Sequence, residues 1–350
     1  MNINPIAIYN GNFVIYWSGL IIALGIAAGF LLTLSIYVAQ HGSSSAVWVF
    51  LPFAIVFSVV LCRVLHWYCH EEQYASFFEA VSDYSYGSYC LPGALLGVYL
   101  AALISKNLGF TSNTGKLLDA IAPGFALTIA LVRLSSLFNT SCRSKYTVEA
   151  DIFKRLPFAV AVSDASGNVS YRFATFFVEF LIMLVVTVVL IGMYYRFHNA
   201  RMKRPCRRDG HIFGLFLIYF GAVELVLDST RNDSSFMHFP GTLKIINKFF
   251  GFVSVGQLCS AIIILFIMLY YSKRSIRANG HKAYHVVLWS TYFVSLAIVG
   301  VLEYCVQRWS NMHNIIYIGM VIGALIMTIS AQKMYKSCIE SVEPLQDEYE

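Results

Sequence analysis

Six ionisable side chains lie within or at the ends of long apolar stretches of this 350-residue chain, where charged groups usually serve a function. They are Arg63, Arg133, Glu179, Glu224, Asp228 and Glu303. A charge at membrane depth costs roughly 2.5–3.5 kcal/mol on insertion scales, so six unpaired charges would cost on the order of 15 kcal/mol, comparable to the stability of a whole domain. We therefore expect these side chains to converge on one another, on water or on a ligand.

Arg133 has two chemical interpretations. It lies in the apolar stretch 119–139, where it could form a structural ion pair between helices. Alternatively, its planar guanidinium could hold an anionic or zwitterionic headgroup through paired N–H donors. Glu224 and Asp228 lie four residues apart, so on a helix they share a face and repel each other unless a cation lies between them. Arg63 and Arg133 are the available cations, and this combination favours a polar cavity.

The composition is that of a membrane protein. Hydrophobic residues make up 58% of the chain and charged residues 13%, whereas a soluble domain has about a quarter of its residues charged. No basic region is interleaved with aromatic residues, so we expect no nucleic-acid binding. The eight cysteines are scattered singly and form no C-x-x-C pair, which argues against a zinc site and a disulfide framework. We expect neither a metal nor a cofactor.

The apolar stretches predict an all-α integral membrane protein with about nine transmembrane helices. We place the helices at residues 13–39, 46–69, 89–105, 116–138, 172–197, 212–229, 250–271, 283–306 and 314–336. The third is short and contains Pro92 and Gly93, which suggests a tilted or partly re-entrant element.

Two basic connections predict the orientation. Segment 196–208 holds six Arg and Lys residues, and segment 272–282 holds four. Placing both on the cytoplasmic side of a plasma membrane puts the N-terminus outside and the C-terminus in the cytoplasm. On this topology every intramembrane charge lies toward the outer end of its helix, which predicts a polar cavity that a lipid could enter from the outer leaflet. Ion and proton pathways usually distribute acids through the full membrane depth, so a transporter is disfavoured.

Several short stretches resemble the motifs of one enzyme family. Residues 119–123 read D-A-I-A-P, like the family's D-x-I-A-P, and residues 133–139 are similar to its R-x-G-N-F-x-N signature. Residues 214–222, followed by Asp228 and Arg231, give the clearest match. From about residue 10 to residue 271 the chain resembles prolipoprotein diacylglyceryl transferase, a bacterial membrane enzyme. That enzyme moves a diacylglyceryl group from phosphatidylglycerol to the cysteine thiol of a lipoprotein.

The resemblance implies an architecture, partners and a site. The seven-helix core would occupy residues 1–271, with a small extracytoplasmic cap at 139–171, where an apolar run and a turn predict a hairpin. Two added helices would follow at 272–336, and an acidic cytoplasmic tail at 337–350. The partners would be phosphatidylglycerol and a prolipoprotein signal peptide. The expected catalytic residues are Arg133, Asp228 and Glu224, and the expected substrate-binding residues are Arg63, Asn139, Glu179 and Arg231.

Departures from the family fall on its chemistry. The family's histidine, a candidate base toward the thiol, is Pro92 here, and an arginine of the sixth helix is Glu224. Thiol alkylation requires a base, because a free cysteine is only a few per cent ionised at neutral pH. Glu224, Asp228 and His66 are the remaining candidates, although a histidine at a helix end is more often structural. The alternative is a catalytically degenerate paralogue that binds a lipid or a lipoprotein.

Overall fold

The computed structural model describes residues 5–11, 13–41, 43–69, 74, 76–82, 91–138, 143–163, 168–198, 209–232, 251–308 and 312–340. The chain divides into two compact units. The N-terminal unit comprises Met1–Ile191 with Thr230–Ser234, and the C-terminal unit comprises Gly192–Ser229 with Ser235–Glu350. Among the described residues, eight helices are long and apolar enough to cross a membrane, and one shorter apolar helix accompanies them. The predicted all-α membrane protein is therefore confirmed.

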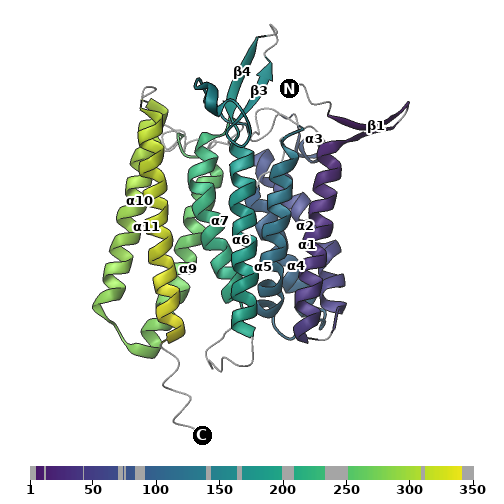
Figure 1. The fold of residues 1–350 in the computed structure, drawn as a ribbon. Coiled ribbons are helices and arrows are strands. Elements are labelled where there is room, and N and C mark those ends of the chain that lie inside the picture. The colour runs from purple at the N-terminus through teal and green to yellow at the C-terminus, as the bar shows by residue number, and fades with distance from the viewer. Residues whose placement is uncertain are drawn as a thin grey trace. The chain divides into compact units, whose positions relative to one another are not determined.

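The N-terminal unit is built from paired helices (Figure 1). Its elements are α1 (Trp17–His41), α2 (Ser45–Cys69), the short α3 (Phe77–Ser82), α4 (Leu91–Asn107), α5 (Thr114–Ser135) and most of α6 (Thr175–His198). Helix α1 packs against α5, and α2 packs against α4.

Glycines bring these helix pairs together. A Cβ atom on Gly29 of α1 would lie 2.4 Å from the carbonyl oxygen of Gly124 on α5, and one on Gly124 would lie 2.3 Å from that of Gly29. Gly93 and Gly97 of α4 allow the same close approach to α2, because Cβ atoms there would lie within 2.5 Å of backbone nitrogens. Lipid does not drive apolar helices together, so small residues that allow backbone contact supply the packing.

Helix α4 explains how the short third apolar stretch is accommodated. It is continuous from Leu91 to Asn107, and Pro92 lies in its first turn, where the missing N–H costs no intrahelical hydrogen bond. Its 17 residues span about 26 Å, slightly less than the roughly 30 Å hydrocarbon core. Whether α4 is tilted relative to the membrane stays a prediction.

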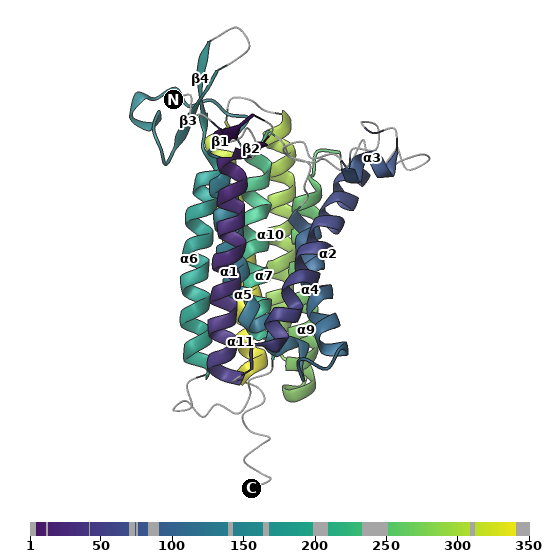
Figure 2. The same ribbon diagram turned by 90° about the vertical axis from the view of Figure 1, so that its right-hand side faces the viewer.

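Two β-hairpins lie at one end of the N-terminal helices (Figure 2). Strands β3 (Ala159–Ser163) and β4 (Val169–Phe173) form the hairpin that was predicted for the cap. A second hairpin, β1 (Ile6–Asn10) with β2 (Phe13–Tyr16), was not predicted. The first helix therefore begins at Trp17 and not at residue 13, because residues 13–16 are apolar in either conformation and hydropathy alone does not separate a strand from a helix.

The C-terminal unit contains α7 (His211–Thr230, up to Ser229 in this unit), α9 (Val255–Asn279), α10 (Ala283–Arg308) and α11 (His313–Glu340). Helix α9 begins with a capping box in which Ser254 and Gln257 each bond the other's backbone N–H. It continues eight residues past the predicted end at 271 and stops before Gly280, whose φ of 71° favours glycine. Helices α10 and α11 pack against each other as the two added helices.

Candidate functional site

A cavity of about 840 Å³ lies inside the N-terminal unit, lined by side chains from α1, α2, α4 and α5. Its polar end lies where α1 begins and α5 ends, and it is lined there by Ser18, Arg133, Ser135, Ser136 and Arg231. From that end the lining residues of α1 continue to Thr33, which is about 22 Å of helix. This length exceeds the about 15 Å depth of one hydrocarbon leaflet.

The deeper part of the cavity is chemically apolar in spite of its hydroxyl groups. Thr33 Oγ1 donates to the Gly29 carbonyl at 2.8 Å, and Thr128 Oγ1 donates to the Gly124 carbonyl at 3.0 Å. These hydroxyls satisfy their own hydrogen-bonding capacity on backbone oxygens, so they offer little to a ligand. Ser58, whose hydroxyl donates to the Ala94 carbonyl at 3.3 Å, and Cys62 also line the cavity, and the other residues of this part are glycine, aliphatic or aromatic. The cavity therefore has one polar end and a long apolar body.

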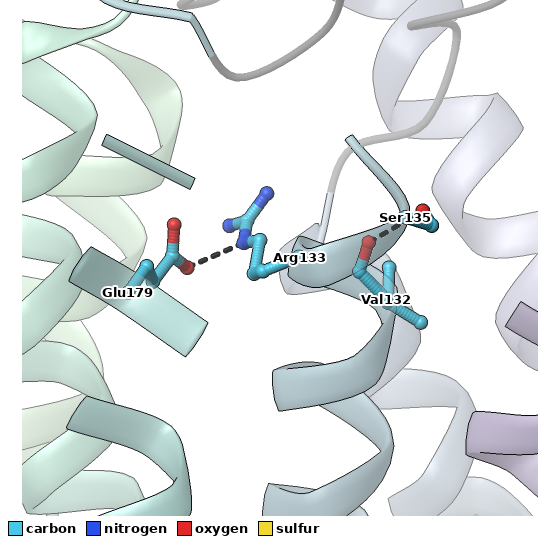
Figure 3. A network of polar contacts seen from close by, with 4 residues as sticks. All are labelled: Val132, Arg133, Ser135 and Glu179. Carbon is cyan, nitrogen blue, oxygen red and sulfur yellow. Dashed lines mark hydrogen bonds and ion pairs between the residues drawn. The ribbon is translucent and has the colours of Figure 1, made fainter. Parts of the chain in front are cut away.

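The polar end holds a buried ion pair (Figure 3). Arg133 Nε, on α5, donates to Glu179 Oε1, on α6, at 2.5 Å, and the two side chains are 7% and 1% exposed. In Figure 3 the two side chains point toward each other from α5 and α6. Glu179 thus fixes the orientation of Arg133 through Nε, and of the six intramembrane charges that were expected to converge, these two are in direct contact.

Arg231 reaches the same cavity from the cap. Its backbone pairs with Ser144 in an antiparallel bridge, which is flanked by bonds from Lys145 N–H to the Thr230 carbonyl at 3.0 Å and from Asn232 N–H to the Arg143 carbonyl at 2.8 Å. Arg133 and Arg231 both line the polar end of the cavity. Their guanidinium groups suit an anionic group of a ligand.

The other predicted residues of the N-terminal unit lie outside the cavity lining. Arg63 on α2 is 2% exposed, and its neighbour Cys62 lines the cavity while Arg63 does not. His66 Nε2 lies 3.2 Å from the Tyr74 hydroxyl, which agrees with a structural role for this histidine. Asn139 lies outside the described residues.

Glu224 and Asp228 belong to the C-terminal unit, where both are 5% exposed on α7. The Ser254 hydroxyl, which caps α9, donates to Asp228 Oδ2. Gln257 Nε2 donates to the Leu225 carbonyl and to Glu303 Oε2, both at 3.0 Å. Asp228 and Glu303 thus take part in a buried network across α7, α9 and α10. Their convergence with the arginines of the other unit stays a prediction.

Sequence analysis missed two arginines in the cap. Arg172 pairs with Thr147 in an antiparallel bridge, and Arg143 lies near enough to be affected by the charge of Arg172. The Nε atoms of both are buried, and neither has a hydrogen-bond partner. Burial, and then the charge of Arg172, lower the pKa of Arg143.

Within the described ranges, no group of three or more His, Cys, Asp or Glu side chains has an arrangement that could hold a metal ion. The arginines at one end of the cavity and its apolar body suit an amphiphile with an anionic headgroup.

The comparison with known proteins agrees with this geometry. Residues 5–273 match the prolipoprotein diacylglyceryl transferase family. The chain is 27% identical over 237 residues to the phosphatidylglycerol–prolipoprotein diacylglyceryl transferase of Acaryochloris marina, covering 64% of this chain and 78% of that protein. It is 26% identical over 291 residues to the enzyme of the same name from Streptococcus pyogenes serotype M5, covering 81% of this chain and 99% of that protein. The chain therefore belongs to the prolipoprotein diacylglyceryl transferase family.

Proposed function

We propose that this protein binds phosphatidylglycerol in the cavity of its N-terminal unit and moves the diacylglyceryl group onto the cysteine thiol of a prolipoprotein. The observation that carries the proposal is the division of the cavity into a cationic end and an apolar body. The phosphodiester would lie at Arg133 and Arg231, and the acyl chains would lie along α1 and α5. In a plasma membrane with the N-terminus outside and the C-terminus cytoplasmic, the polar end faces the outer leaflet.

The chemistry follows from the two substrates. The thiolate sulfur attacks the glycerol carbon bonded to the phosphate oxygen, so a C–S bond forms and a C–O bond breaks. Glycerol phosphate leaves with the electron pair, and negative charge grows on its oxygens. Arg133 would stabilise that charge, because guanidinium donors bind phosphate in a paired geometry. Glu179 would act as a positioning residue that orients Arg133.

The remaining roles are assigned by family resemblance. Arg63, Asn139 and Arg231 would contribute to substrate binding. Asp228 or Glu224 would accept the thiol proton in place of the family's histidine. Both acids are buried and lie one turn apart on α7.

A second candidate function rests on Pro92. It occupies the position of the family's histidine. Because Leu91 and Ala94 in the same turn line the cavity, that histidine would lie beside the cavity, and this chain has a proline there instead. A protein that binds phosphatidylglycerol or a lipoprotein without transfer would keep the cavity and lose this base.

Complementation of a bacterial strain depleted of its own diacylglyceryl transferase tests the proposal. We expect the wild-type chain to restore growth and lipoprotein modification, and Arg133→Gln to abolish the rescue at equal expression. The matched control is Arg155→Gln, which removes an exposed arginine in the cap. If the well-expressed wild-type chain fails and Pro92→His with Glu224→Arg succeeds, the binding function replaces transfer.

A further inference from the structure

The C-terminal unit holds a second pocket, of about 570 Å³, where α10 begins and α11 ends. It is lined by Lys282, Tyr284, Val287, Leu288, Lys333, Lys336 and Ser337. We call it the lysine pocket. All of its lining residues follow residue 273, where the match to the family ends, so family membership does not account for it.

Hydroxyl groups hold the three helix ends around the lysine pocket in place. Ser275 Oγ lies 2.6 Å from Ser337 Oγ and 3.2 Å from the Tyr284 hydroxyl, and Tyr284 also bonds Ser337. The Lys282 N–H donates to His285 Nδ1 at 3.2 Å, so His285 Nε2 donates to Ser275 Oγ at 2.9 Å. This network joins the end of α9, the start of α10 and the end of α11, so the wall of the pocket is ordered.

The charge of the lysine pocket comes from distant parts of the chain. Lys282 precedes α10, while Lys333 and Lys336 lie one turn apart near the end of α11, about fifty residues later. Among the described residues, those that line the pocket include no acid. Lysines at a membrane boundary usually point separately into the headgroup layer. Here the fold gathers three of them around one hollow, which concentrates positive charge for a single anion.

The rim of the lysine pocket is apolar and faces outward. Val287 is 60% exposed and lines the pocket together with Leu288. Both residues lie on α10, which is long and apolar enough to cross a membrane. A free inorganic anion gains nothing from these side chains, whereas a lipid places its phosphate among the lysines and its glycerol and upper acyl carbons against the rim. Basic pockets between transmembrane helices are known to hold anionic lipid headgroups.

We propose that the lysine pocket binds the phosphate headgroup of an anionic phospholipid. The ligand class is set by three ammonium groups, which bind phosphate as point charges, and by the apolar rim. The site is separate from the cavity of the N-terminal unit, and the inference does not depend on the proposed transfer activity. It gives the two added helices a role in holding a lipid.

Native mass spectrometry of the full-length protein tests this inference. We would compare phosphatidylglycerol with phosphatidylcholine that carries the same acyl chains, in wild type and in Lys333→Gln with Lys336→Gln. We expect the double variant to retain one fewer phosphatidylglycerol molecule per protein. Its affinity for that lipid should be about 25-fold lower, because each lysine near an anionic lipid contributes binding free energy and two lysines are removed. The matched control, Lys106→Gln with Lys116→Gln, removes two lysines of the N-terminal unit and should behave as wild type.

Further arms separate the possible outcomes. Lys333→Arg with Lys336→Arg keeps both charges and should retain the lipid. If the Arg variant also lost the lipid, the loss in the Gln variant would come from misfolding and not from the missing charges. Arg133→Gln should leave this site filled, which distinguishes it from the proposed transfer site. Equal retention by the Gln variant, equal binding of phosphatidylcholine, or full displacement of the lipid by millimolar inorganic phosphate would each overturn the proposal.

Discussion

Removal of the Glu179 carboxylate should destabilise the N-terminal unit through the charge that it leaves behind. In Glu179→Ala, the Arg133 guanidinium stays 7% exposed without the partner that now accepts from its Nε at 2.5 Å. Breaking a buried pair in this way costs about 3–5 kcal/mol. For a unit of this size, each kcal/mol corresponds to about 2–4 °C in Tm, so we expect Tm to fall by about 6–20 °C.

Replacement of both partners should be much milder. Arg133→Met with Glu179→Leu fills the same space with apolar side chains, and such replacements are often neutral or stabilising. Thermal unfolding of the purified protein in detergent measures both variants, with labelling of the buried Cys62 thiol as the readout for the N-terminal unit. The reasoning fails if the single variant unfolds at the wild-type Tm, or if the double variant is as unstable as the single one.

Three further predictions concern packing, capping and pH. Gly124→Ala should lower stability by about 1–3 kcal/mol in thermal unfolding, because its Cβ would lie 2.3 Å from a backbone oxygen of α1, whereas Gly192→Ala, with open space around it, should not destabilise. Ser254→Ala should cost about 1–3 kcal/mol by the same measurement, because it removes both a helix cap and a buried hydrogen bond, while Ser254→Thr should retain most of the stability. Lys154, through a hydrogen bond and then through its charge, lowers the pKa of Asp151, so in Lys154→Gln an NMR titration should find that pKa raised toward its ordinary value. Any stability from this exposed pair is present above the ordinary aspartate pKa and is lost as pH falls through the lowered one; an unchanged titration in Lys154→Gln would contradict the assignment.

Much of the architecture follows from local sequence patterns. Runs of about twenty apolar residues predict the long helices, because backbone groups in lipid must be satisfied within the segment. The cap hairpin was predicted from the apolar run and turn residues between 158 and 168. The cost of buried charge predicted that Arg133 and Glu179 would have partners, and they pair with each other. The ends of helices were less predictable, as α9 shows by running on to Asn279.

Tertiary structure decided the features that depend on contacts between distant segments. The sequence alone determined that the chain is helical, membrane-embedded and charged at depth, since hydropathy and charge are properties of each segment by itself. Only the fold places Gly29 against Gly124, opens a cavity with one cationic end, and gathers Lys282 with Lys333 and Lys336. Helix faces within a membrane are nearly equal in hydrophobicity, so periodicity does not indicate which faces meet. Backbone approach and polar pairing make that choice.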